Sequence, residues 1–239
     1  MKIRYIFIAL LIFLTLIIGS FPMRGVSLLL DNSNNISYKS AKGFWWDGEL
    51  LDIYFEDNYL GDLQAKLSLF DVIKGRSIFF IKLEGPNINL KGRLGRSLVG
   101  TYLIEDLDFS LISSNTKKLN TPISSATGSI DQLLFNQSGC LKANGGAEAK
   151  VLDLFGIFSQ NLYVQSSLEC RGAFLELKFS ALNPKDLKGT LLINPSMKYT
   201  MEASSERVSS KIKELGKFRL DLDPSIKAKG NLVDLINHL

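Results

Sequence analysis

Apolar and polar residues alternate with a period of two along most of the chain beyond Asp31. In residues 105–111, for example, Leu107, Phe109 and Leu111 are apolar, and the residues between them are acidic or hydroxylated. The same alternation runs through residues 62–70, 86–92, 147–151, 173–180 and 225–230. Alternation of this kind predicts strands with one buried and one wet face, and a succession of them, separated by Gly, Asn and Pro, predicts an antiparallel sheet. We therefore expect a mainly β fold, built as a curved sheet or a sandwich, with one or two short helices.

The apolar positions of these segments form one expected face of the sheet. It is represented by Leu63, Leu67, Phe109, Leu175 and Phe179. A sheet with one apolar face must cover that face with a second sheet, a helix or a ligand. Helix signals are few, because only residues 204–216 and, more weakly, residues 233–239 carry them. The cover is therefore a second half of the sheet or a lipid. A second half of the sheet would give a closed core, whereas a lipid ligand would require an open groove.

A polar stretch interrupts the alternating pattern near the middle of the chain. Residues 113–127 contain one proline and many Ser, Thr and Asn residues, which predicts a long loop. This loop divides the β-rich chain into two halves, 25–112 and 128–239, that we expect to be similar. Each half contains a glycine-rich stretch, at 92–100 and at 144–150, that we interpret as a turn.

The first 24 residues form a separate apolar segment. No charged residue occurs between Arg4 and Arg24, a run of 19 residues, and a helix of about 20 apolar residues spans a bilayer. We interpret residues 1–24 as an uncleaved membrane anchor, with a cleaved signal peptide as the alternative. Lys2 and Arg4 place the N-terminus in the cytoplasm. Residues 25–239 would then form a β-rich domain in the periplasm of a bacterium, beyond a single crossing of the inner membrane.

Charge and the inventory of residues exclude several classes of function. Without the three cations of residues 1–24, the chain has 25 basic and 24 acidic residues, which is too balanced for a nucleic-acid surface. The only histidine, His238, lies one residue from the end, which argues against Ser-His-Asp and Cys-His catalysis. Phosphate-binding glycine motifs and the nucleophile elbow are absent from the sequence. We therefore predict a protein that is not an enzyme, with no catalytic residues, no metal site and no cofactor.

Two cysteines are a candidate disulfide. Cys140 and Cys170 are the only cysteines in the chain and lie 30 residues apart. In an oxidising compartment such as the periplasm they can pair. Two unrelated buried thiols are the alternative.

Two adjacent tryptophans are the most conspicuous surface candidates. Trp45 and Trp46 are the only tryptophans in the chain and lie between two glycines. Neighbouring side chains of a strand point to opposite faces, so one tryptophan would be in the core and the other on a membrane or partner surface. Structural packing of both, with bonded indole N–H groups, is the alternative.

Several stretches of the sequence, taken in order, resemble the type II secretion system protein N family, also called general secretion pathway protein N. In the first half they are "SFPMRGVSLLL", "AKGFWWDGELLDIYF", "LEGPNINLKGRLG" and "GTYLIEDLDFSLI". In the second half they are "GSIDQLLF", "SGCLKANGGAEAKVL", "LECRGAFLEL", "KGTLLINPSMKYTMEASS" and "IKAKGNL". The resemblance covers most of the chain and rests on order, length and cysteine placement, since no single motif is diagnostic. The chain departs from it in being richer in Lys, Asn, Ile and Phe than we expect of that family.

This resemblance implies a non-enzymatic, inner-membrane component of a secretion apparatus, whose partners are membrane lipid and other secretion-system proteins. The turn around the tryptophans is also similar to that of AsmA-like anchored periplasmic proteins. Their amphipathic strands make a curved sheet whose apolar concave face suits acyl chains. Two functions therefore follow as alternatives: a secretion component that acts by protein–protein contact, or a lipid-binding or lipid-transfer module of the AsmA-like or lipopolysaccharide-export type.

Overall fold

A computed structural model describes residues 20–23, 36–55, 58–112, 123–151, 162–183, 187–205 and 225–231 of the chain. The strands in these residues are β1 (Ile36–Phe44), β2 (Asp47–Phe55), β3 (Asn58–Leu67), β4 (Arg76–Glu84), β5 (Ile88–Ser97), β6 (Tyr102–Ile112), β7 (Ile123–Asn136), β8 (Gly139–Val151), β9 (Leu162–Arg171), β10 (Phe174–Asn183), β11 (Leu187–Ile193), β12 (Lys198–Ser205) and β13 (Ser225–Asn231). A short helix, α3 (Leu69–Ile73), lies between β3 and β4.

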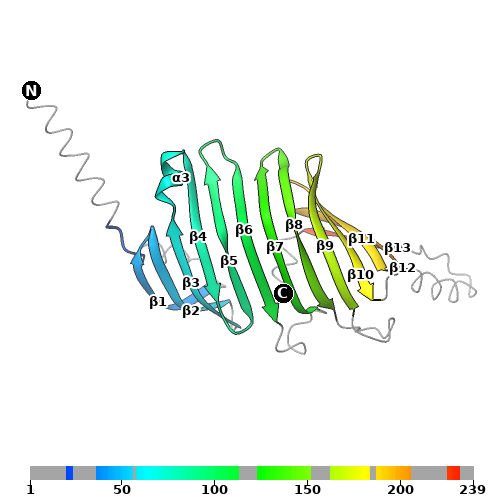
Figure 1. The fold of residues 1–239 in the computed structure, drawn as a ribbon, viewed down its shortest axis with the longest axis horizontal. Helices are drawn as coiled ribbons and strands as arrows, with labels where there is room; N and C mark the ends of the chain where they lie inside the picture. The colour runs from blue at the N-terminus through cyan, green and yellow to red at the C-terminus, as the bar shows by residue number, and fades with distance from the viewer. Residues whose placement is uncertain are drawn as a thin grey trace, which may run out of the picture.

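All thirteen strands belong to one antiparallel sheet, in which each strand pairs with the strands before and after it in the chain (Figure 1). The two expected halves share this sheet, because β6 pairs with β7. Residues 123–127, which we expected in the central loop, belong to β7, and Ser125, Ala126 and Thr127 pair with both β6 and β8. The loop prediction is wrong for these five residues because their Ser, Ala and Thr side chains resemble a loop in composition, although small side chains also suit a strand in a curved sheet.

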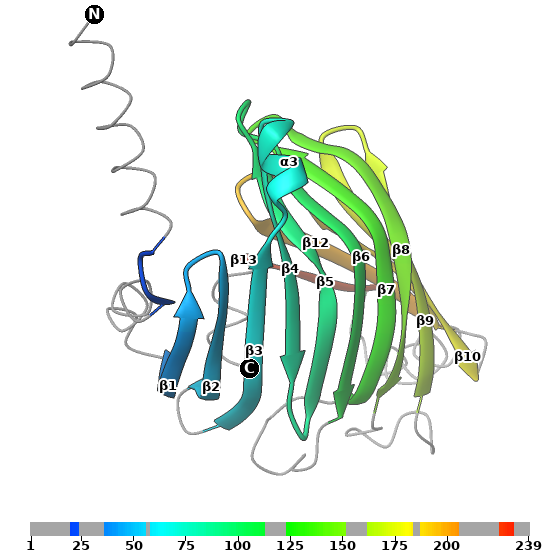
Figure 2. The ribbon, with the colours of Figure 1, turned by 60° about the vertical axis from the view of Figure 1, so that its left-hand side comes forward.

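The sheet is open and strongly curved (Figure 2). In that view β12 and β13 lie behind β4–β6, so the sheet has a concave side and a convex side. Helix α3 packs on β4 from the convex side. The strands that the structure describes form this one sheet and no second one, so for them the curved sheet is correct and the sandwich alternative is wrong.

The register of the strands separates the two faces of the sheet. Directly opposite residues of antiparallel strands lie on the same face, so the pairs can be followed as a row across the sheet. One row consists of apolar residues and glycines, with one serine: Ala41, Leu50, Leu63, Leu83, Leu90, Phe109, Gly128, Ala147, Ser166, Phe179, Gly189 and Ala203. The adjacent row, on the other face, is Lys42, Glu49, Gln64, Lys82, Lys91, Asp108, Ser129, Gly146, Ser167, Lys178, Thr190 and Glu202. We call the first face, which is concave, the inner face and the second the outer face.

The glycine-rich stretches lie mainly in strands, so their interpretation as turns is wrong. Residues 92–97 belong to β5, with a turn only beyond them, and residues 144–150 lie within β8. On the inner face, a Cβ added to Gly92 would lie 2.7 Å from the Cδ1 of Leu107. Bending a sheet crowds the side chains of its concave face, so some positions on that face have no room for a side chain.

The alternating pattern did not predict helix α3. Leu69, which we expected on the apolar strand face, is the first residue of this helix. Ser68 caps the helix: its Oγ accepts a hydrogen bond from the Asp71 N–H at 3.4 Å and donates one to the Asp71 carboxylate at 2.6 Å. A Ser three residues before an acid is a recognised signal for a helix start, so residues 68–71 did contain the information.

Three expectations lie wholly or mostly outside the described residues. They are the membrane anchor, of which only residues 20–23 are described, the helix over 204–216 beyond Ser205, and the terminal helix over 233–239. Within the described ranges, no helix is long and apolar enough to cross a membrane.

Candidate functional site

The five residues chosen to represent the apolar face all lie on the inner face of the sheet. Leu63, Phe109 and Phe179 share the row defined above. Leu67 and Leu175 follow at the alternate positions of their strands and therefore point to the same side. Leu67 is buried and the others are half-buried. The register thus joins residues from both halves of the chain into one continuous apolar surface.

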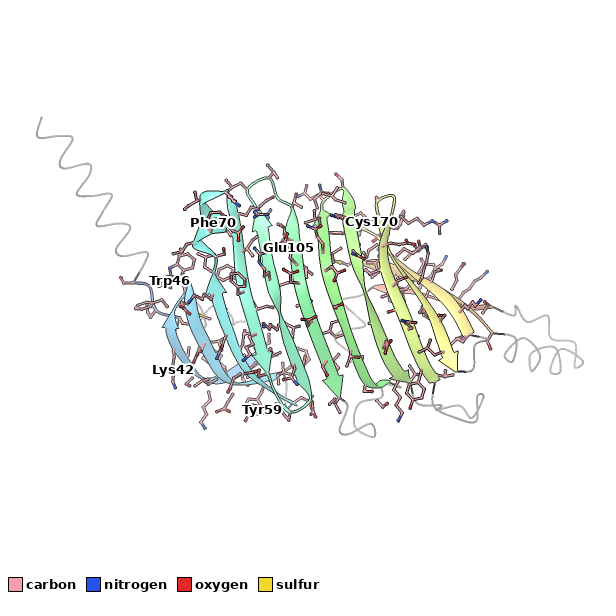
Figure 3. The ribbon with its side chains drawn as sticks, viewed as in Figure 1. Lys42, Trp46, Tyr59, Phe70, Glu105 and Cys170 are labelled. Atoms are coloured by element: carbon pink, nitrogen blue, oxygen red, sulfur yellow. A yellow bond between two sulfur atoms is a disulfide. The ribbon has the colours of Figure 1, made fainter. Side chains whose placement is uncertain are left out.

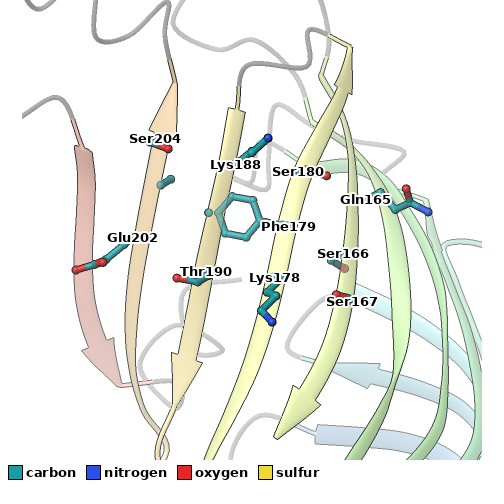
Figure 4. A pocket seen from close by; sticks show the side chains of 12 residues that line it. Gln165, Ser166, Ser167, Lys178, Phe179, Ser180, Lys188, Thr190, Glu202 and Ser204 are labelled. Carbon is teal, nitrogen blue, oxygen red and sulfur yellow. The ribbon is translucent and has the colours of Figure 1, made fainter. Parts of the chain in front are cut away.

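Aromatic rings of the inner face lie over glycines of the next strand. Phe109 is directly opposite Gly128, and a Cβ at that glycine would lie 2.8 Å from the Cζ of the ring. Phe179 is opposite Gly189 in the same way, and Figure 4 shows its ring beside β11. A ring in this position covers the backbone of the neighbouring strand with apolar surface. The inner face is therefore suited to contact with apolar groups.

The outer face is a charged surface with two shallow hollows. Cross-strand ion pairs join Asp47 to Lys66 at 3.1 Å and Glu169 to Lys178. A hollow of about 590 Å³ crosses β2–β6, and another of about 620 Å³ crosses β9–β12. The polar residues that line the second hollow are Gln165, Ser166, Ser167, Lys178, Ser180, Lys188, Thr190, Glu202 and Ser204 (Figure 4). Charged and hydroxyl groups at this density favour a solvated surface or contact with another protein.

One buried charge cluster fixes α3 to the outer face. Asp71 is 3% exposed and forms ion pairs with Arg76 of β4 and with Arg93 of β5, the second at 2.9 Å. Arg93 also pairs with Glu105 of β6 at 3.0 Å. The hydrogen bond from Ser68 and then the two guanidinium groups lower the pKa of Asp71, against the opposing effect of burial. The carboxylate therefore stays ionised and connects the helix to two strands.

The tryptophans form the tight turn between β1 and β2. The expectation that they alternate across a strand is therefore wrong. Gly43, whose φ of +80° favours glycine, faces Gly48 across the hairpin and lets the chain turn there. Both tryptophans are half-buried, and the ring of Trp46 stacks on Phe44 with centroids 5.8 Å apart. Whether either side chain meets a membrane or a partner stays a prediction.

Cys140 and Cys170 form a disulfide in the structure, with Cα atoms 5.6 Å apart. Cys140 is at the start of β8, and Cys170 is near the end of β9 (Figure 3). The last register pair between these strands is Gly145 with Leu168, so the disulfide joins them beyond their paired region. The candidate disulfide between the two cysteines is thus present in the structure.

The described residues hold no group of three His, Cys, Asp or Glu side chains that could bind a metal ion. His238, the only histidine, lies outside them. The described part of the chain presents two contrasting surfaces, an apolar inner face and a charged outer face.

These features define a class of protein in which a single open antiparallel sheet, apolar on its concave side, presents extended contact surfaces. The family model for type II secretion system (T2SS) protein N matches residues 34–230, which include β1–β12 and all but the last residue of β13. The chain belongs to this family and is a component of the secretion apparatus, as the resemblance implied. No curated protein and no solved structure gives a significant match.

Proposed function

We propose that the chain is a non-catalytic component of the type II secretion apparatus, anchored in the inner membrane by residues 1–24 and acting in the periplasm by protein–protein contact. Family membership over residues 34–230 is the observation that carries this proposal. The outer face supports it, because a regular sheet holds a charged surface in fixed geometry over many strands. The uncharged run that precedes Arg24 supports the anchor.

A secretion assay in the native bacterium tests this role. Deleting the gene should leave type II substrates in the periplasm, and expressing the full chain should restore their release. A chain with residues 1–24 replaced by a cleavable signal peptide should not restore it. Normal secretion in the deletion strain would contradict the role in secretion, whereas full restoration by the cleaved form would contradict only the anchor.

Photo-crosslinking tests the contact surface. Lys82 and Leu83 are neighbours on β4 that belong to the outer and inner rows, respectively. A photoreactive amino acid at Lys82 should capture another secretion-system protein in cells, whereas the same group at Leu83 should not. Equal capture from both positions, or from neither, would argue against the outer face as the contact surface.

The inner face supports lipid binding as a second candidate function. Its apolar row crosses strands of both halves, and its aromatic rings lie over glycines. An acyl chain is an apolar ligand of suitable shape for such a concave surface. Native mass spectrometry of the purified full chain, followed by solvent extraction, should then detect stoichiometric phospholipid or lipid A, and Phe109→Asp should abolish it. An unliganded parent protein would exclude this candidate.

A further inference from the structure

Helix α3 has its polar side against the sheet and its apolar side exposed. Asp71, its buried residue, pairs with Arg76, whereas Leu69, Phe70 and Ile73 are 62%, 67% and 85% exposed. A surface helix of a soluble domain normally buries its apolar residues and exposes its polar ones. Ion pairs hold α3 in the opposite orientation, so its outward side is built to face something apolar.

The exposed apolar side of α3 continues into the neighbouring turns. On one side, the Leu98 N–H of the β5–β6 turn donates a hydrogen bond to the Gly75 carbonyl at 3.1 Å, and Leu98 and Val99 are both 88% exposed. On the other side, the Leu67 N–H donates to the Trp46 carbonyl at 2.7 Å. The resulting patch lies along one end of the strands, where the chain turns, and Figure 3 shows Phe70 and Trp46 there. We call this patch the apolar edge; it consists of Phe44, Leu69, Phe70, Ile73, Leu98 and Val99.

The N-terminal segment joins the domain at this edge. The Trp45 N–H donates a hydrogen bond to the carbonyl of Phe21 at 3.2 Å, and Pro22 forms a bridge with Phe44. Ser20 and Phe21 lie close to the end of the uncharged apolar run of the sequence, which stops before Arg24. If that run crosses the bilayer, the domain begins at the membrane surface with the apolar edge beside it.

The charges around the apolar edge also suit a bilayer that contains anionic lipid. The Lys74 Nζ lies 4.0 Å from the Phe70 ring centroid, and the Arg96 guanidinium lies 5.0 Å from that of Tyr102. Asp47, the first residue of β2, and Asp71 of α3 are both in ion pairs. Cations beside aromatic rings, with the acids neutralised, match the lipid headgroup region.

We propose that the apolar edge rests in the headgroup region of the inner membrane, with α3 and the β5–β6 turn among the lipid headgroups. Because the edge is made of turns, the strands then stand on the membrane and both faces of the sheet remain in the periplasm. This inference rests on the proposed anchor. It assigns the surface next to the membrane to the turns and leaves the faces available for other contacts.

Quenching of tryptophan fluorescence by brominated phospholipids tests the proposal on the full chain in vesicles of phosphatidylethanolamine and phosphatidylglycerol. Phe70→Trp and Leu98→Trp each add a reporter at the apolar edge. Tyr59→Trp adds one at the opposite end of the strands (Figure 3). The native tryptophans are retained, so the added emission is the difference from the parent. Intact disulfide and parental circular dichroism identify the variants that are folded.

The expected result is that lipid brominated near the headgroup removes most of the added emission of both edge reporters and little of that of Tyr59→Trp. Quenching of the edge reporters no greater than that of Tyr59→Trp would overturn the proposal, because the edge would then not contact lipid. Loss of the parent protein from vesicles on alkaline carbonate extraction would instead show that the anchor has failed. Two edge reporters at separate positions keep the test valid if one variant does not fold.

Discussion

Replacing Asp71 by Asn should destabilise the protein through the outer-face charge cluster. The substitution keeps the size of the side chain but removes the charge that faces Arg76 and Arg93, whose side chains are only 33% and 25% exposed. The Nε atoms of both arginines are buried and make no hydrogen bond within the described residues. Breaking a fully buried ion pair costs about 3–5 kcal/mol, and the partial exposure of the guanidinium groups favours the lower end, about 3 kcal/mol. The urea midpoint should then fall by about 1 M.

The pH dependence of this loss follows from the lowered pKa of Asp71. A carboxyl group with a lower pKa in the folded state stabilises the protein fully above its unfolded value of about 3.9. That stabilisation disappears as the pH falls through the folded pKa. The difference between the parent and Asp71→Asn should therefore be largest near neutral pH and should shrink below about pH 4.

Urea unfolding of the full chain in detergent, followed by tryptophan fluorescence, measures the loss. Asp108→Asn is the matched control, because Asp108 is exposed on the same face and has no ion pair in the described part of the chain. If only α3 detaches, amide exchange at Val72 and Lys74, whose N–H groups close the helix, should accelerate. A loss no larger than that of the control, or one of constant size from pH 7 to pH 3, would refute the assigned role of the cluster.

Four further substitutions test three other features of the structure. Cys140→Ser and Cys170→Ser should each lower stability by about 3–4 kcal/mol, since either removes the same disulfide; unequal losses in urea unfolding would contradict a shared bond. Gly189→Ala should cost about 1–3 kcal/mol by overpacking against the Phe179 ring, and a thermal midpoint equal to that of the parent would count against crowding of the inner face. Trp46→Ala should cost at least about 1 kcal/mol through loss of its aromatic stack, and unchanged thermal unfolding would show that the stack is not stabilising.

The sequence by itself determined the β class of the fold and which residues share a face. Alternation in 105–111 and 173–180 assigned Phe109 and Phe179 to the apolar side of their strands, and the register of the sheet puts both residues in one row. This succeeds because side-chain direction in a strand depends only on the backbone period of two. The order of the quoted stretches also indicated the family correctly, since order survives when individual motifs are weak.

Only the tertiary structure decided that the sheet is open and curved and which side chains from distant parts of the chain meet. Alternation is the same in a sandwich and in an open curved sheet, so the choice between them depends on long-range register that the pattern does not contain. Gly92 resembled a turn residue because the sequence does not show that Leu107 of the next strand occupies its space. Likewise, the sequence of α3 predicts neither its exposed apolar side nor the burial of Asp71, because the arginines that hold it come from two other elements.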